Sequence, residues 1–171
     1  MTDDIKLKIT HKTEFQALQD LIISTIIFLG LSAIVLFYAE LPYLALTLLA
    51  FYTILYFTPV IILHSNYENV NKNKELIFQN EKLEFGNEII EYKNIEKIKA
   101  VGTYQSINKT SLSKLPYQCA YFYIKIEMKN SNIIYLTNLY SKNLIEIISN
   151  RIPNQTIEKE ITSFPFIKNY S

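Results

Sequence analysis

Two long apolar runs dominate the hydrophobic pattern, from Leu21 to Ala39 and from Leu41 to Leu63, and a short joint containing Glu40 and Pro42 separates them. Neither run contains Asp, Glu, Lys, Arg or His. A bilayer core about 30 Å thick takes roughly 20 apolar residues in a helix, and a spanning backbone must satisfy its own hydrogen bonds. The pattern therefore predicts a transmembrane helical hairpin over residues 21–63.

Two other interpretations of these runs are less consistent with the pattern. The first run is longer than the apolar region of a cleaved signal peptide and lacks a clean small-x-small cleavage site. Two helices buried in a soluble protein would normally show a polar face, which these runs lack. The hairpin interpretation is therefore preferred.

Basic residues occur on one side of the predicted hairpin only. Lys6, Lys8 and Lys12 precede it, Lys72 and Lys74 follow it, and the joint has none. The positive-inside rule therefore predicts that both termini are cytoplasmic. The heavy use of Lys, Asn, Ile and Tyr is typical of an AT-rich genome, which favours a bacterial inner membrane.

Local signals predict how the helices begin, end and meet. Thr13 is the expected N-cap of a helical lead-in to the first span, and Pro59 is expected to kink the second helix or to end it early. Small residues are expected to let the helices approach closely, within the hairpin by default or in a homo-oligomer. They are Gly30, Ser32, Ala33, Ala45 and Ala50.

After residue 74 the apolar period changes from helical to two, which predicts short strands. The expected strands are 75–79, 82–85, 88–92, 94–101, 118–128 and 133–137, with tight turns at 80–81, 86–87 and 130–131. Residues 141–152 return to helical spacing, with Ser141 as a possible cap and Pro153 as the stop. Residues 5–9 also alternate, and this strand either pairs with the C-terminal domain or lies free at the membrane.

These elements divide the chain into five segments. They are a cytoplasmic N-terminal segment (1–20), the transmembrane hairpin (21–63), a linker (64–74), a cytoplasmic domain (75–153) and a tail (154–171). Residues 65–74 are either a true linker or a continuation of the second helix. The tail carries enough apolar side chains to dock on the sheet or on the membrane interface.

Composition narrows the function classes. The 171 residues carry a formal net charge of +1, so no strong field indicates a nucleic-acid partner. Cys119 is the single cysteine, which excludes an intramolecular disulfide. His11, His64 and Cys119 are far apart in sequence, so no metal site is expected. The three glycines form no phosphate-binding loop. We therefore expect neither a cofactor nor an enzyme.

The stretch from residue 103 to 117 is the longest predicted loop and the best candidate for a binding site. Its lysines and hydroxyl groups are suited to a lipid phosphate, and its aromatic rings to the membrane interface. An exposed loop without a function explains the same residues. The candidates for contact with a headgroup or partner are Tyr104, Lys109, Thr110, Ser111, Lys114 and Tyr117.

The order of short strands closed by one helix resembles a pleckstrin-homology (PH)-like domain. The likeness is carried by residues 76–78, 82–85 and above all 91–98, where an aromatic residue and a polar step precede Ile-x-x-Ile. The whole chain resembles bacterial membrane proteins with a two-helix anchor before a PH-like domain, including those with a YcxB-like region. The resemblance implies an antiparallel β-barrel or sandwich with a C-terminal helix, and a binding or scaffold module.

One departure from the family concerns phosphoinositide recognition. PH domains that read phosphoinositides carry a basic cluster around the first hairpin, whereas residues 79–82 here read Gln-Asn-Glu-Lys. The usual phosphoinositide site is therefore not supported. The sequence favours a membrane-anchored module that engages a protein partner or lipid headgroups. The alternative is an accessory or immunity-type membrane subunit that acts through its hairpin.

Overall fold

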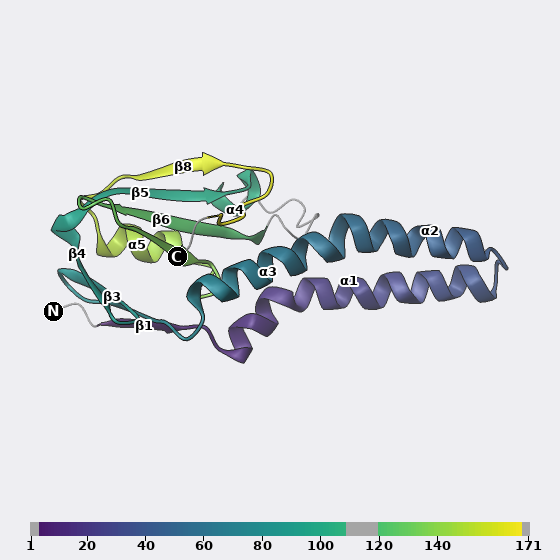
Figure 1. The fold of residues 1–171 in the computed structure, drawn as a ribbon. Coiled ribbons are helices and arrows are strands. Elements are labelled where there is room, and N and C mark those ends of the chain that lie inside the picture. Colours follow the sequence, from purple (N-terminus) through teal and green to yellow (C-terminus); the bar gives the residue numbers. More distant parts are fainter. Residues whose placement is uncertain (1–3, 109–119, 169–171) are drawn as a thin grey trace.

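The computed structural model describes residues 4–108 and 120–168. A β-rich domain forms one end of the molecule and a helical hairpin extends from it (Figure 1). The first helix is α1 (His11–Phe37); the second consists of α2 (Pro42–Tyr52), a π-helical turn (Thr53–Phe57) and α3 (Thr58–Asn71). Both are long and apolar enough to cross a membrane by length and composition, and 17% of the residues in each apolar window are buried.

α1 begins before the predicted cap. Thr10 is the N-cap, and its hydroxyl accepts a hydrogen bond from the backbone N–H of Thr13. The Thr13 hydroxyl in turn accepts one from the backbone N–H of Thr10. This reciprocal capping box satisfies two backbone donors at the helix end. The prediction of Thr13 as N-cap was wrong because Thr13 occupies the third helical position of the box.

The second helix passes through Pro59 without ending. The backbone N–H of Thr58 donates to the carbonyl of Thr53, which is the wide hydrogen-bond spacing of a π-helix. Proline lacks an N–H and its ring crowds the carbonyl four residues earlier, so a widened turn accommodates it. The helix ends only at Asn71. Of the two effects expected of Pro59, the early end was therefore wrong. Residues 65–71 continue the helix, which was one of the two possibilities for this stretch.

A polar cluster joins the two helices inside the hairpin. The Tyr52 hydroxyl lies 2.9 Å from the Ser24 hydroxyl and 2.7 Å from the Thr25 hydroxyl. The Tyr52 ring stacks on Phe28, with centroids 4.5 Å apart. Both hydroxyls on α1 also donate to the Leu21 carbonyl. These contacts fix the register of the two helices.

The small residues of the hairpin divide between its inner and outer faces. Ser32 and Ala45 are buried, as a close helix contact requires. Gly30, Ala33 and Ala50 are exposed, and a Cβ added at Gly30 would meet nothing within 4 Å. Contact within the hairpin, the default expectation, is therefore found for Ser32 and Ala45 and not for the other three, for which contact in a homo-oligomer stays a prediction.

We expect Tyr52→Phe to destabilise the hairpin by about 1 kcal/mol, which is the scale of interhelical hydrogen bonds in membrane proteins. The substitution removes the hydroxyl and keeps the ring stacked on Phe28. Unfolding of the whole protein in mixed detergent micelles measures the loss. Tyr43→Phe is the matched control because Tyr43 is 85% exposed. Equal stability of the two variants would contradict a locking role for the cluster.

The first sheet is built across the hairpin. It has the strand order β1-β2-β3-β4, and every neighbouring pair is antiparallel. Its strands are β1 (Ile5–Lys8), β2 (Glu75–Phe78), β3 (Lys82–Phe85) and β4 (Glu88–Glu91). β1 precedes the helices and pairs with β2, which follows them, so the hairpin is inserted between the first two strands. This pairing decides between the two possibilities for residues 5–9.

The second sheet has the order β7-β6-β5-β8. Its strands are β5 (Ile95–Gly102), β6 (Phe122–Met128), β7 (Ile133–Thr137) and β8 (Ile157–Ile161). β8 comes from the tail and pairs with β5 in parallel. The expectation of a wholly antiparallel domain was therefore wrong. The tail forms an edge strand, which agrees with docking on the sheet.

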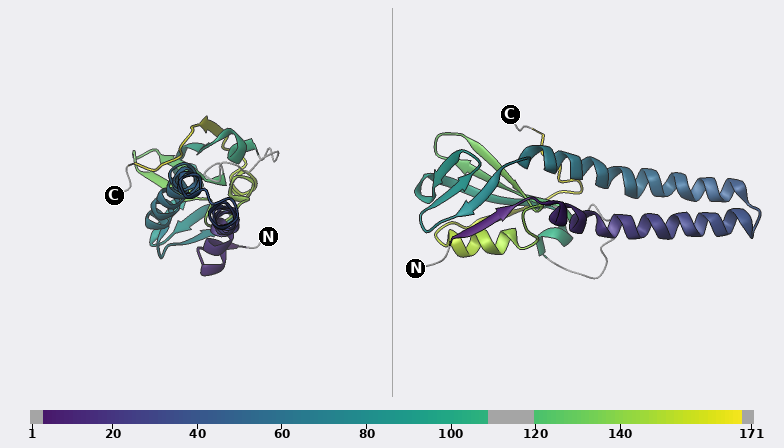
Figure 2. Two further views of the ribbon diagram at one scale, coloured as in Figure 1. Left: turned by 90° about the vertical axis from the view of Figure 1, so that its right-hand side faces the viewer. Right: turned by 90° about the horizontal axis from the view of Figure 1, so that it is seen from below.

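The core lies between the two sheets and is closed by α5 (Leu144–Arg151). Leu76, Leu83, Ile98, Ile124 and Leu144 are each fully buried there. Ser141 does not cap α5: Asn143 is the N-cap, and the Ser141 hydroxyl accepts a hydrogen bond from the Asn143 backbone. Figure 2 shows that the two helices lie side by side and leave the domain in one direction.

Candidate functional site

Most of the predicted binding loop lies outside the described residues. Lys109, Thr110, Ser111, Lys114 and Tyr117 are among them, so their grouping stays a prediction. Tyr104 is described: it is 62% exposed and begins a short helix, α4 (Tyr104–Asn108), where an irregular stretch was expected. α4 ends beside β8, with the Lys159 ammonium donating to the Asn108 side chain at 2.8 Å.

Asn71, the last residue of α3, joins the hairpin to β7. Its amide nitrogen donates to the Tyr135 carbonyl at 2.9 Å. Its amide oxygen accepts from the Thr137 backbone N–H at 2.9 Å and from the Thr137 hydroxyl at 2.7 Å. Asn71 is fully buried. The side chain therefore satisfies backbone groups on the edge of the second sheet.

Asn66 binds the tail in a similar two-sided way. Its amide nitrogen donates to the Ile167 carbonyl and its oxygen accepts from the Ile167 N–H, both at 3.0 Å. One residue along α3, the Tyr67 hydroxyl donates to the Pro165 carbonyl at 2.8 Å. Leu21, Val60, Leu63 and Val70 bury their apolar side chains in the same junction. The hairpin, the sheet and the tail are therefore packed as one unit.

Aromatic rings extend from this junction across the outer face of the second sheet. Tyr67 meets Tyr121 and Tyr123 edge to face, with centroids 5.4 and 6.2 Å apart. Tyr123 meets Tyr135 in the same way at 5.8 Å. Burial raises the pKa of Tyr123 to about 12, with a smaller contribution from the charge of Glu160. Tyr123 therefore remains neutral at physiological pH.

We expect alkaline pH to destabilise the protein through the ionisation of Tyr123. An unfolded tyrosine ionises near pH 10, whereas burial raises the pKa of folded Tyr123 to about 12. Stability is therefore fully present below about pH 10 and is lost as pH rises toward about 12. In detergent, the thermal midpoint should fall through this window, and by less in Tyr123→Phe than in Tyr43→Phe. Parallel curves for the two variants would contradict the assignment.

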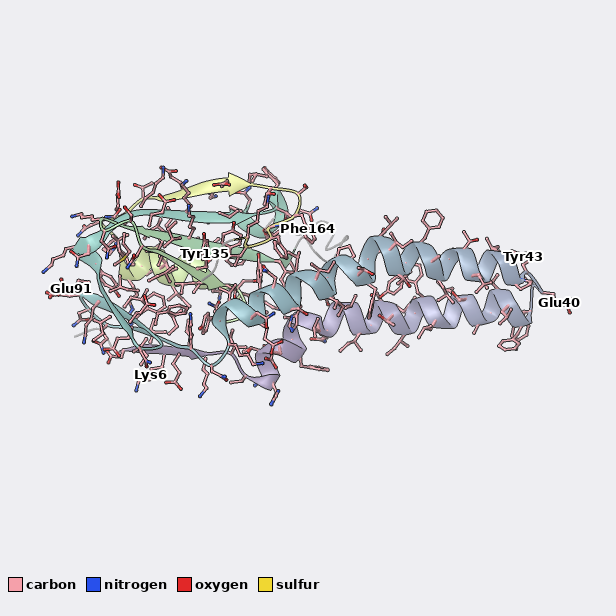
Figure 3. The ribbon with its side chains drawn as sticks, in the orientation of Figure 1. Lys6, Glu40, Tyr43, Glu91, Tyr135 and Phe164 are labelled. Carbon is pink, nitrogen blue, oxygen red and sulfur yellow. The ribbon has the colours of Figure 1, made fainter. Side chains whose placement is uncertain are left out.

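A pocket of about 360 Å³ lies between the outer face of the second sheet and the tail. Such a volume is in the range of small-ligand sites. Figure 3 shows Phe164 at the end of the domain nearer the hairpin and Glu91 at the opposite end. The lining residues are Val101, Tyr123, Lys125, Tyr135, Glu160, Thr162, Phe164, Pro165, Phe166 and Lys168.

The pocket contains charges of both signs. Lys125 and Lys168 contribute positive charge and Glu160 negative charge. The Lys125 ammonium also lies 2.6 Å from a carboxylate oxygen of Glu127. That hydrogen bond raises the pKa of Lys125, and the charge of Glu160 contributes less. The arrangement can therefore bind a ligand that carries both an anionic and a cationic group.

Sequence reasoning missed this pocket and the two asparagines that position its walls. A signal was present: Tyr121 and Tyr123 alternate in the sequence with Phe122 and Ile124, which face the core, so the pattern places both tyrosines on the opposite face of the strand. Aromatic residues on a solvent face are candidates for recognition.

Within residues 4–108 and 120–168, no group of three or more His, Cys, Asp or Glu could hold a metal ion.

Comparison with known families identifies the fold. The sequence profile of the PH domain matches residues 6–145, which is most of the chain. The chain belongs to the PH domain family. No curated protein and no solved structure matches it.

In this PH domain the matched region includes the helical hairpin, because β1 lies before the helices and β2 after them. The β2–β3 turn carries Lys82, whose ammonium lies 3.0 Å from a carboxylate oxygen of Glu84. The Gln79 side chain donates to the same carboxylate. The acidic partner offsets the positive charge at the turn, which agrees with the departure seen in the sequence.

Proposed function

We propose that this protein is a membrane-anchored binding module. Its two long helices cross a bacterial plasma membrane as a hairpin, with both termini in the cytoplasm. Its PH domain engages a protein partner or lipid headgroups and carries out no chemical reaction. Membership of the PH domain family supports a binding role. The length and apolar composition of the two helices support the membrane assignment.

The packing of the domain on the base of the hairpin is the observation that carries this proposal. The hydrogen bonds of Asn66 and Asn71 tie α3 to the tail and to β7. Large apolar side chains remain exposed along the helices, including Ile26 at 66% and Leu46 at 64%. Such a surface is stable in lipid and costly in water. The domain is therefore presented at a fixed position relative to the bilayer.

A second candidate function places the binding surface on the hairpin itself. Gly30 is exposed on α1, and a Cβ there would meet nothing within 4 Å. An exposed small residue on a membrane helix allows another helix to approach closely. An accessory or immunity-type subunit that binds its partner within the bilayer uses such a face.

Photocrosslinking separates the two functions. A photoreactive phenylalanine analogue is placed at Phe166, on the domain, or at Gly30, on the hairpin, in the full chain in its own membrane. The proposed function predicts a specific adduct, with lipid or with protein, from Phe166, and adducts with bulk lipid but with no protein from Gly30. A specific protein adduct from Gly30, with no specific adduct from Phe166, would replace it with the hairpin function.

A further inference from the structure

When the hairpin spans the bilayer, the pocket beside the tail lies at the level of the lipid headgroups. The helix from Pro42 to Leu63 is about 33 Å long at 1.5 Å per residue, which matches a bilayer core of about 30 Å. Tyr67 lies about 6 Å beyond Leu63 along the same helix, and the headgroup layer is about 5–7 Å thick on each side. Tyr67 therefore marks the outer level of the headgroups.

Two of the residues that line the pocket contact Tyr67. Its ring contacts Tyr123, with centroids 6.2 Å apart, and its hydroxyl donates to the carbonyl of Pro165 at 2.8 Å. Both residues line the pocket. The lipid of the adjacent leaflet is therefore the nearest abundant source of a ligand.

The chemistry of the pocket fits a headgroup with two opposite charges. Lys125 and Lys168 supply donors for a phosphate, while Glu160 and the neighbouring tyrosine rings suit an ammonium group. Glu127 partly offsets Lys125, at a distance of 2.6 Å. Because positive and negative charge nearly balance here, a purely anionic headgroup is matched less well than a zwitterionic one.

We propose that this pocket binds the zwitterionic headgroup of a membrane phospholipid, of the phosphoethanolamine class. The inference rests on the proposed function, because it needs the hairpin to lie in the bilayer. It assigns the ligand to the outer face of the second sheet, far from the β2–β3 turn. The stacked rings of Phe164 and Phe166, 6.3 Å apart, cover the pocket from the side of the tail.

Tryptophan fluorescence tests the proposal in the full chain, which has no tryptophan of its own. Three single variants are placed in phosphatidylglycerol nanodiscs: Phe166→Trp at the pocket, Ile89→Trp on β4, and Tyr43→Trp at the hairpin turn. A small fraction of brominated phosphatidylethanolamine, or of brominated phosphatidylglycerol, is then added. We expect Phe166→Trp to be quenched more by the ethanolamine lipid, and Ile89→Trp, which is 64% exposed, to be quenched by neither.

Removing one positive charge of the pocket should weaken the preference. Lys168→Gln leaves the Lys125–Glu127 pair intact and should weaken the selective quenching about tenfold, as loss of one charge-assisted hydrogen bond predicts. Lys142→Gln, at an exposed lysine near α5, should leave it unchanged. Excess inorganic phosphate should not relieve the quenching, and relief would reassign the site to a free anion.

The Tyr43→Trp variant distinguishes failure of the lipid site from failure of the membrane anchor. If Tyr43→Trp is quenched by both lipids and Phe166→Trp shows no headgroup preference, the lipid site is overturned and the anchor stands. If Tyr43→Trp is not quenched by either lipid, the anchor itself is wrong. Equal quenching of Phe166→Trp and Ile89→Trp would also overturn the lipid site.

Discussion

Replacing Asn71 with alanine is expected to lower the free energy of unfolding by about 3 kcal/mol. The substitution deprives the Tyr135 carbonyl and the Thr137 N–H of their partner in the buried junction. Each buried polar group left unpaired costs about 1–3 kcal/mol. Unfolding of the full chain in detergent, followed by circular dichroism, measures the change.

The matched control for this prediction is Asn154→Ala. Asn154 is exposed in the turn after α5, and an exposed substitution normally changes stability by less than about 0.5 kcal/mol. Asn71→Ala should therefore be clearly the less stable of the two. If both variants unfold together with the unchanged protein, the junction between α3 and β7 contributes little and the domain is not held by it.

The Gly-to-Ala substitution is expected to have opposite signs at two positions. At Gly102 a Cβ would lie 2.5 Å from the Ser106 hydroxyl oxygen and 2.7 Å from the Cβ of Phe122. The Phe122 atom is fixed by the backbone of β6, so the sheet must shift, and overpacking of this kind costs about 1–3 kcal/mol. At Gly30 nothing lies within 4 Å, and alanine is the better helix former by about 1 kcal/mol.

Both variants are compared with the unchanged protein under one set of unfolding conditions. Gly102→Ala should unfold earlier, and Gly30→Ala at the same point or later. A stable Gly102→Ala variant would show that α4 and β6 do not pack closely at the end of β5. A marked loss in Gly30→Ala would show that this face of α1 is packed against another chain.

Elements with a strong local pattern were predictable. The apolar runs gave the helix pair, and the Asn80-Glu81 turn with its flanking alternation gave the β2–β3 hairpin in the observed register. The boundaries were less predictable, because a capping box and a π-helical turn depend on geometry that single residues do not reveal. The two examples are the capping box at Thr10 and the π-helical turn before Pro59.

The pairings that close the domain could not be derived from local sequence. β1 pairs with β2, although the whole hairpin separates them in sequence, and the residue pattern of neither strand indicates which strand it pairs with. β8 pairs in parallel with β5, yet residues 158–161 are exposed and show no apolar alternation. Non-local pairing follows from the packing of the entire core, and the propensity of these residues does not encode it.

The candidate site was missed for a related reason. Asn66 and Asn71 lie in a polar stretch that suited a linker, and their role depends on carbonyl and N–H groups supplied by distant segments. The outward-facing Tyr123 of β6 was visible in the pattern, but the tail segment that lines the pocket with it was not. A polar side chain at the end of an apolar helix therefore merits attention as a possible docking contact.

Accessibility of single cysteines in intact bacterial cells decides whether the PH domain sits on a membrane hairpin. In a Cys119→Ser background, Glu40→Cys marks the hairpin turn and Lys142→Cys marks the domain. A membrane-impermeant maleimide should label Glu40→Cys from outside, and Lys142→Cys only after the membrane is opened. The protein should also remain in the membrane pellet at alkaline pH. Labelling of both positions from one side, or release into the soluble fraction, would contradict the anchor and its orientation.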